Sequence, residues 1–143
     1  MDRKLIGFTC GAFDLCHAGH MMAFHECKKQ CDYLIVALQT DPTIDRPDTK
    51  NKPIMSIFER WRILKSIKYI DEIIIYETEK DLVNILKDTK PDIRFIGKDW
   101  EEKEYTGKEL PIKVIFNSRN HNFSTNELRE RVCKATTKAN NVL

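Results

Sequence analysis

The sequence predicts an α/β protein, a doubly wound sandwich in which helices cover both faces of a five-stranded parallel sheet. Short apolar runs alternate along the chain with segments of helical periodicity. Most of these runs are apolar on successive residues, which is typical of strands buried on both faces of a parallel sheet. The 143 residues fit one domain, so we expect a single domain over residues 1–143, with a core at about 4–132 and a C-terminal tail at 133–143.

Five runs rich in β-branched and aromatic residues are the expected strands. They are Lys4–Cys10, Asp32–Leu38, Glu72–Tyr76, Ile93–Ile96 and Ile112–Phe116. Because parallel strands need crossover connections, we expect right-handed βαβ units. Ligands bind beyond the carboxyl ends of the strands in such sheets, so the segments that follow the strands are where a site is expected.

Four segments between and after these runs have helical patterns, and three of them open with a capping residue followed three positions later by Glu or Asp. The expected helices are Gly19–Gln30, Ser56–Lys68, a helix that opens at Thr78 and ends before Pro91, and Ser124–Lys138. Two long loops remain, Thr40–Met55 and Gly97–Leu110. Loops of that length in a compact domain are usually functional.

Composition excludes several classes of protein. Lys plus Arg is 24 and Asp plus Glu is 22, so a net charge of +2 argues against a nucleic-acid or membrane-surface partner. The apolar runs are far shorter than the ~20 residues that span a bilayer, and no signal-peptide pattern follows the N-terminus. The five cysteines are odd in number and irregularly spaced, which disfavours a secreted disulfide framework. We therefore expect a cytoplasmic protein.

The segment after the first strand has the features of an anion site. Gly11 and Ala12 lack bulk where the chain turns, and Gly19 lets a large group approach. His17 and His20 are three residues apart, so they share one face if they straddle the helix start. The helix N-terminus adds free N–H groups and the positive end of its dipole. Two imidazole donors at such a site suit a phosphate that undergoes attack.

The segment after the last strand resembles a second phosphate site. Ser124 is an expected N-cap, so the N–H groups that follow it point out of the helix end, and Arg119 supplies a permanent forked cation. Lys50 and Lys52 lie in the loop after the second strand, where a lysine pair is ordinarily solvated surface. Asp99 and Trp100 follow the fourth strand, where a base could bind.

Residues 11–20, Gly-Ala-Phe-Asp-Leu-Cys-His-Ala-Gly-His, closely resemble the Gly-x-Phe-Asp-x-x-His-x-Gly-His signature of the cytidylyltransferases, which belong to the HxGH nucleotidyltransferase superfamily. The similarity covers about residues 4–132 and is greatest to the bacterial glycerol-3-phosphate cytidylyltransferases. Segments 59–72, 97–100 and 119–128 resemble further motifs of that family. The resemblance implies a Rossmann-like sheet, a homodimer and a divalent metal, Mg²⁺, that accompanies the nucleotide.

By this resemblance the chain would transfer CMP from CTP to a small phosphorylated alcohol, giving a CDP-alcohol and pyrophosphate. The histidines would stabilise the α-phosphate, and Arg119, Ser124 and Thr125 would hold the β- and γ-phosphates. Asp99 or nearby backbone groups would accept from the exocyclic amine of cytosine. No protein ligand for a metal is expected. The expected catalytic residues are His17, His20, Lys52 and Arg119. The expected nucleotide-binding residues are Gly11, Ala12, Phe13, His17, Gly19, His20, Lys50, Lys52, Gly97, Asp99, Arg119, Phe123, Ser124 and Thr125.

The sequence departs from the family at two positions, and the second of them leaves the acceptor open. Lys68 stands where the relatives have Arg, which keeps the charge and loses the bidentate fork. Leu82 stands at the position of a lysine thought to meet the acceptor, and Lys80, two residues earlier, falls on the opposite face of the helix. Glycerol, ethanolamine, choline and sugar phosphates all remain candidates.

Other functions also remain open. They are an adenylyltransferase that uses ATP, a nucleotide-binding module without catalysis, and a zinc or redox module. The last is prompted by three histidines and three cysteines within residues 16–31, which lack a standard zinc spacing. Cys27 and Cys31 recur at helical spacing, which favours core positions for both.

Overall fold

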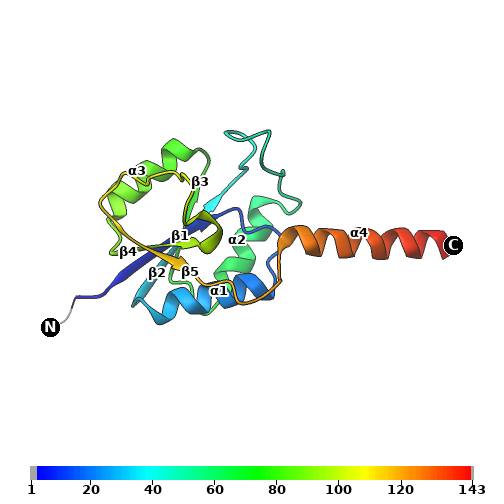
Figure 1. The fold of residues 1–143 in the computed structure, drawn as a ribbon, viewed down its shortest axis with the longest axis horizontal. Coiled ribbons are helices and arrows are strands. Elements are labelled where there is room, and N and C mark those ends of the chain that lie inside the picture. The colour runs from blue at the N-terminus through cyan, green and yellow to red at the C-terminus, as the bar shows by residue number, and fades with distance from the viewer. Residues whose placement is uncertain (1–2, 143) are drawn as a thin grey trace.

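Five parallel strands form one sheet in the order β3-β2-β1-β4-β5 (Figure 1). The computed structural model describes residues 3–142, and the side chains of residues 3–137. The strands are β1 (Ile6–Gly11), β2 (Tyr33–Gln39), β3 (Glu72–Tyr76), β4 (Ile93–Gly97) and β5 (Lys113–Asn117). The predicted α/β, Rossmann-like architecture with a five-stranded parallel sheet is confirmed.

Four helices and one short 3₁₀ turn complete the described chain. They are α1 (Ala18–Lys29), α2 (Ile57–Lys65), α3 (Glu79–Thr89), η1 (Lys98–Trp100) and α4 (Thr125–Val142). Two helix ends differ from expectation. The helix α2 ends three residues before Lys68, because Ser66 and Ile67 donate their amide N–H groups to carbonyls three residues earlier and tighten the chain into a turn. The helix α4 continues past Lys138, so most of the expected tail is helical.

The predicted caps form at the starts of α2 and α3. Ser56 Oγ accepts from the N–H of Glu59 at 3.1 Å, and a Glu59 carboxylate oxygen accepts from the N–H of Ser56 at 3.0 Å. Thr78 and Asp81 make the same reciprocal pair at 3.1 and 3.0 Å. At α4, Ser124 Oγ accepts from the N–H of Glu127 at 3.0 Å. These side chains satisfy N–H groups that a helix start leaves without partners.

A separate apolar core fills each face of the sheet, which is the doubly wound arrangement. One core packs α1 and α2 against the sheet and contains Phe24, Leu64 and Phe95. The other packs α3 against the opposite face and contains Phe8, Leu82 and Leu86. Phe24, Leu64 and Leu86 are almost fully buried. Burial of this kind stabilises each helix on its face far more than helix propensity does.

The topological switch point lies between β1 and β4. The strand β1 pairs with β2 on one side and with β4 on the other. The chain winds outward from β1 to β3 and then crosses back to β4 and β5, so the loops beyond β1 and β4 diverge. A crevice opens beyond the strands at such a point.

The helix α4 projects away from the sheet and its other helices (Figure 1). Val132 is 57% exposed, and residues 130–137 are exposed throughout. Among the helices of residues 3–142, none is both long and apolar enough to cross a bilayer.

Candidate functional site

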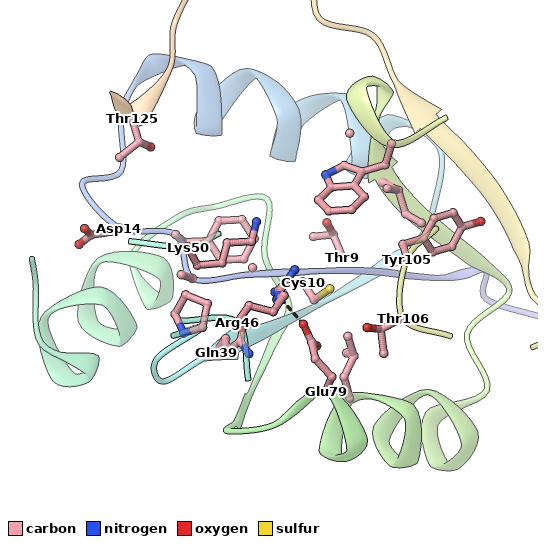
Figure 2. A pocket seen from close by; sticks show the side chains of 18 of the residues that line it. Thr9, Cys10, Asp14, Gln39, Arg46, Lys50, Glu79, Tyr105, Thr106 and Thr125 are labelled. Carbon is pink, nitrogen blue, oxygen red and sulfur yellow. Dashed lines mark ion pairs between the residues drawn. The ribbon is translucent and has the colours of Figure 1, made fainter. Parts of the chain in front are cut away.

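A cleft of about 980 Å³ opens beyond the carboxyl ends of the strands (Figure 2). The ends of β1, β2, β3 and β4 form its floor, and the loop 40–55, the turn η1 and the first residues of α4 form its rim. Seven of the predicted site residues line it: Gly11, Ala12, Phe13, His20, Lys50, Gly97 and Thr125. The segments that meet here are more than 100 residues apart in the sequence.

The loop after β1 is held in an unusual conformation. Phe13 and Leu15 both have left-handed backbones, with φ of 49° and 50°, which costs about 1–2 kcal/mol for a residue with a Cβ. Asp14 between them is buried, and its carboxylate accepts from the N–H groups of Ile54 and Met55 at 2.8 and 2.9 Å. Arg129 of α4 pairs with the same carboxylate at 2.9 Å. These contacts hold the strained loop in place, a role for Asp14 that sequence reasoning missed.

His17 and His20 stand at the start of α1, as predicted. His17 is the N-cap, and its Nδ1 accepts from the N–H of Gly19 at 3.0 Å. His20 Nδ1 accepts from the N–H of His17 at 3.1 Å. Because each Nδ1 is an acceptor, each neutral ring carries its proton on Nε2. Both side chains therefore present an N–H donor on the edge of the ring that the backbone does not use.

Both histidines are neutral at pH 7. Burial, assisted by the nearby His17, lowers the pKa of His20 to about 4. Burial also lowers the pKa of His17, and His121 and Arg119 add to the effect. The two rings lie 4.1 Å apart between centroids. His17 Nε2 lies 3.4 Å from Thr125 Oγ1, which brings the start of α4 to the histidine pair.

The segment 119–125 folds back over Gly19. A Cβ added at Gly19 would lie 2.8 Å from a His17 ring carbon and 2.9 Å from a His121 ring carbon, so a larger residue there would have to displace these rings. His121 stacks on Phe123 with a centroid distance of 5.2 Å. Sequence reasoning missed His121, although it lies within the segment predicted to bind phosphate.

Arg119 and Asp99 form an ion pair at 2.5 Å. Both side chains are largely exposed and belong to the segments that follow β5 and β4. Arg119 also donates to the carbonyl of Phe123 at 3.4 Å. The two residues are predicted to contact different parts of the nucleotide, and in the structure their side chains pair with each other.

Lys50 and Lys52 differ in position. Lys50 lines the cleft, and its ammonium lies 5.4 Å from the centre of the Trp100 ring. Burial and the neighbouring Arg46 lower the pKa of Lys50. Lys52 is exposed and lies outside the residues that line the cleft, as do Asp99, Arg119, Phe123, Ser124, Gly19 and His17.

Arg60 of α2 joins the elements that frame the cleft. It is 2% exposed and donates to four backbone carbonyls, those of Ala12, Gln39, Thr40 and Met55, at 2.6–3.0 Å. These carbonyls belong to the loop after β1, the end of β2 and the start of α2. Arg60 is thus a structural residue that holds three segments together.

The cysteines lie in different environments: Cys10 lines the cleft, and Cys133 is exposed on α4. Cys27 and Cys31 are buried in the core beside α1, as expected, and burial raises the pKa of the Cys27 thiol to about 12. In the described residues, no group of three His, Cys, Asp or Glu side chains is placed to hold a metal ion.

Several charged residues of the cleft were not anticipated, among them Arg46, Glu79 and Arg94. Arg94 had a visible signal, since it interrupts the apolar strand Ile93–Ile96. Arg46 lies in a loop that was predicted to be functional, and Glu79 follows the Thr78 cap.

The fold and the site together define an α/β protein of the nucleotidyltransferase type. The parallel sheet has its switch point beside β1, and two neutral histidines stand at the helix start beyond that strand. A family model described as cytidylyltransferase-like matches residues 8–131. The chain belongs to the cytidylyltransferase-like family.

Named relatives share this region. The chain is 30% identical over 131 residues to the bifunctional protein HldE of Campylobacter jejuni, covering 92% of this chain and 28% of that protein. It is 32% identical over 132 residues to the HldE of Helicobacter pylori, again covering 92% and 28%. The chain thus spans little more than a quarter of these relatives.

Solved structures share the fold. A lipopolysaccharide core biosynthesis protein from Thermoplasma volcanium matches with a TM-score of 0.69 and 24% identity, covering 83% of this chain and 100% of that one. A pantoate-beta-alanine ligase from Francisella tularensis matches with a TM-score of 0.56 and 16% identity, covering 90% and 66%. The likeness to the glycerol-3-phosphate cytidylyltransferases stays a prediction.

Proposed function

We propose that this chain transfers CMP from CTP to the phosphate of a small phosphorylated alcohol and releases pyrophosphate. An oxygen of the acceptor phosphate attacks the α-phosphorus of CTP, and the bond from that phosphorus to the bridging oxygen of the pyrophosphate breaks. The new P–O–P linkage gives a CDP-alcohol. The observation that carries the proposal is the pair of neutral Nε2–H donors at the start of α1: His20 lines the cleft at the switch point, and the ring of His17 lies beside that of His20.

The histidines act on the charge that builds during this attack. Each Nε2–H is oriented by the bond that its own Nδ1 makes to the backbone, so it donates without reorganisation. His17 Nε2 is 3.4 Å from Thr125 Oγ1, and a phosphate oxygen between α1 and α4 would replace that long contact. Neutral donors keep their full effect at pH 7, since neither ring must lose a proton first. No covalent intermediate on the protein is needed.

We assign the β- and γ-phosphates to the start of α4 and to the loop 40–55, which contains Lys50 and Lys52. The free N–H groups behind the Ser124 cap and the Thr125 hydroxyl offer donors at a helix N-terminus. Of the two lysines, Lys50 is inside the cleft and is the better placed, while Lys52 would have to reach over the rim. Arg119 would leave Asp99 to meet the leaving pyrophosphate.

Mg²⁺ is proposed to arrive with the triphosphate. The described residues offer no set of three metal-ligating side chains, and the Asp14 carboxylate is occupied by two N–H groups and Arg129. The side chains of residues 3–137 therefore do not form a Mg²⁺ cage of their own, and a Mg²⁺ that keeps phosphate and water ligands suits such a site.

The experiment that tests this function compares nucleotides. Purified protein is incubated with CTP or ATP, Mg²⁺ and a mixture of phosphorylated alcohols, and pyrophosphate release is followed. We expect release with CTP that depends on the acceptors, and a CTP-induced rise in Tm larger than that with ATP. Preference for ATP would make the chain an adenylyltransferase, and Tm shifts without release would make it a non-catalytic nucleotide-binding module.

We also propose that the protein works in the cytoplasm as a homodimer. The cysteines in the described part of the chain are free thiols, which suits a reducing compartment. The exposed face of α4 around Val132 offers apolar surface that a second copy could cover.

A further inference from the structure

A third histidine lies beside the start of α1, although it comes from a distant part of the sequence. His121 belongs to the segment between β5 and α4, and its ring Cε1 would lie 2.9 Å from a Cβ added at Gly19. The ring Cε1 of His17 would lie 2.8 Å from the same point. The two rings therefore meet over the first turn of α1. Their closeness has an electrostatic effect as well, since His121 contributes to the lowered pKa of His17.

The ring of His121 is held in the same way as the ring of His17. Its Nδ1 accepts from the N–H of Phe123, two residues later, at 3.0 Å. The Nδ1 of His17 accepts from the N–H of Gly19, also two residues later and at 3.0 Å. Because Nδ1 of His121 is an acceptor, the neutral ring carries its proton on Nε2. The ring also stacks on Phe123, so His121 offers a third oriented Nε2–H donor.

The segment that carries His121 is tied to α1 at both of its ends. A carboxylate oxygen of Glu26 accepts from the N–H and from the hydroxyl of Ser118, each at 3.0 Å, which joins the start of the segment to α1. At the other end, Thr125 Oγ1 lies 3.4 Å from Nε2 of His17. A donor that is fixed in this way does not have to reorganise when charge develops beside it, and such donors are the most effective in catalysis.

The neighbours of His121 relate it to one part of the triphosphate in the proposed reaction. His17 is proposed to contact the α-phosphate, and Thr125 with the first N–H groups of α4 is proposed to hold the β- and γ-phosphates. His121 belongs to the same segment as Thr125 and meets the ring of His17 over Gly19. A donor between these two groups is beside the bond that breaks, which joins the α-phosphorus to the bridging oxygen of the leaving pyrophosphate.

We propose that His121 is a further catalytic residue, whose Nε2–H donates a hydrogen bond to the leaving pyrophosphate. When the acceptor oxygen attacks the α-phosphorus, the electron pair of the breaking P–O bond stays on the oxygen that leaves with the β-phosphate. The hydrogen bond stabilises the negative charge of this oxygen, and the proton stays on His121 throughout. The inference rests on the proposed nucleotidyl transfer and adds a residue that acts on the leaving group, whereas His17 and His20 act on the α-phosphate.

Two substitutions separate the Nε2–H donor from the contact with the backbone. In His121→Gln, the side-chain amide nitrogen can take the place of Nε2 and donate, while the acceptor for the N–H of Phe123 is lost. In His121→Asn, the side-chain oxygen can accept from the N–H two residues later, as Asn commonly does in turns, while the donor at the position of Nε2 is lost. His25→Asn is the matched control, because His25 stacks on Tyr69, away from the cleft.

The first measurement is pyrophosphate release at saturating CTP, with the phosphorylated alcohol that the parent protein uses best. We expect His121→Asn to lower kcat about 10- to 100-fold and His121→Gln to lower it less than about 5-fold, with the KM for the acceptor nearly unchanged in both. His25→Asn should resemble the parent protein. A kcat that is lower in His121→Gln than in His121→Asn would show that His121 only supports the segment. Equal turnover in all four proteins would remove His121 from the reaction.

The second measurement is a calorimetric titration with pyrophosphate and Mg²⁺, which needs neither an acceptor nor turnover. We expect the parent protein to bind pyrophosphate, His121→Asn to raise the Kd about 10-fold, and His121→Gln to stay within about 3-fold of the parent. A parent protein that binds no pyrophosphate, or a Kd that His121→Asn leaves unchanged, would overturn the assignment. Absence of release by the parent protein with every nucleotide and acceptor would instead overturn the proposed function, and the titration would still decide whether His121 belongs to a pyrophosphate site.

Discussion

At the scale of the residue, the central feature is that the two nitrogens of each imidazole have different roles. One nitrogen of His17 and one of His20 hold backbone N–H groups, and the other nitrogen is left as a donor. The spacing of the two histidines predicted that they share a face of the helix start. It did not predict their tautomers, because these are set by contacts that form only when His17 caps α1.

The variant His17→Asn separates catalysis from capping. Asn is as good an N-cap as any residue, so it should keep the bond to Gly19 N–H while the Nε2–H donor is lost. We expect turnover to fall at least ~100-fold, with the free energy of unfolding within about 1 kcal/mol of the parent protein. Steady-state pyrophosphate release and urea unfolding measure the two quantities.

The control for this variant is His25→Asn. His25 is on the same helix but stacks on Tyr69 at 4.8 Å, away from the cleft. Its loss should leave turnover nearly unchanged. Near-normal turnover in folded His17→Asn would remove His17 from the chemistry.

The lowered pKa of His20 predicts a pH dependence of stability. The ring has a pKa of about 4 in the folded protein, below its ordinary value of 6.5. As the pH falls below 6.5, the unfolded chain takes up the proton first, so the free energy of unfolding should decline down to about pH 4 and be at its full value above 6.5.

Urea unfolding of the parent protein and His20→Asn across pH 4 to 7.5 tests this pH dependence. The Asn side chain can keep an acceptor near the position of Nδ1, but it does not titrate. The difference in unfolding free energy between the two proteins should therefore change over this window. Parallel curves would show that His20 does not titrate as described.

Arg119 and Asp99 show the limit of residue-level prediction. Each follows a different strand, and each was assigned to a separate part of the nucleotide. Their ion pair depends on the adjacency of β4 and β5, which no local pattern of either segment contains.

At the scale of elements, the capping residues predicted the helix starts well, whereas the ends of α2 and α4 differ from expectation. Ser56, Thr78 and Ser124 cap the helices expected of them, because an N-cap is a contact within four residues. The end of α2 depends on a turn that feeds β3. The length of α4 has no local stop signal, since Gly and Pro are absent from residues 125–143.

Arg60 is the strongest link between elements around the cleft. Replacing it with Met should remove the donor from four carbonyls and lower the free energy of unfolding by about 3 kcal/mol or more. Arg62→Met is the control, because Arg62 is exposed on the same helix, and it should change stability by less than about 0.5 kcal/mol. Urea unfolding of both variants measures the difference, and equal losses would contradict a clamp at Arg60.

At the scale of the whole molecule, the alternation of strands and helices was sufficient to predict the sheet. The order of the strands could not be predicted in this way, because pairing of β1 with β4 joins residues more than 80 apart in the sequence. The full set of residues that line the cleft could not be predicted from local patterns either. The histidine motif could be recognised because it lies within ten consecutive residues. Arg46, Glu79 and Arg94 are far apart in the sequence and come together only in the folded protein.

The distribution of charge in the folded molecule also explains how a net charge of only +2 is compatible with an anion site. It argued against a partner that is attracted by a general basic field. The folded chain places Arg46, Lys50 and Arg94 along a single cleft, so a local anion site coexists with a nearly balanced surface.

The reaction proposed for this cleft is the attack of an acceptor phosphate on the α-phosphorus of a nucleoside triphosphate. The most direct measurement is ³¹P NMR of a reaction that contains the protein, CTP, Mg²⁺ and a phosphorylated polyol. We expect two coupled signals of a new diphosphate diester together with an equal amount of free pyrophosphate, both absent without the acceptor. Pyrophosphate that accumulates with CMP alone, or a spectrum unchanged with CTP and with ATP, would contradict it.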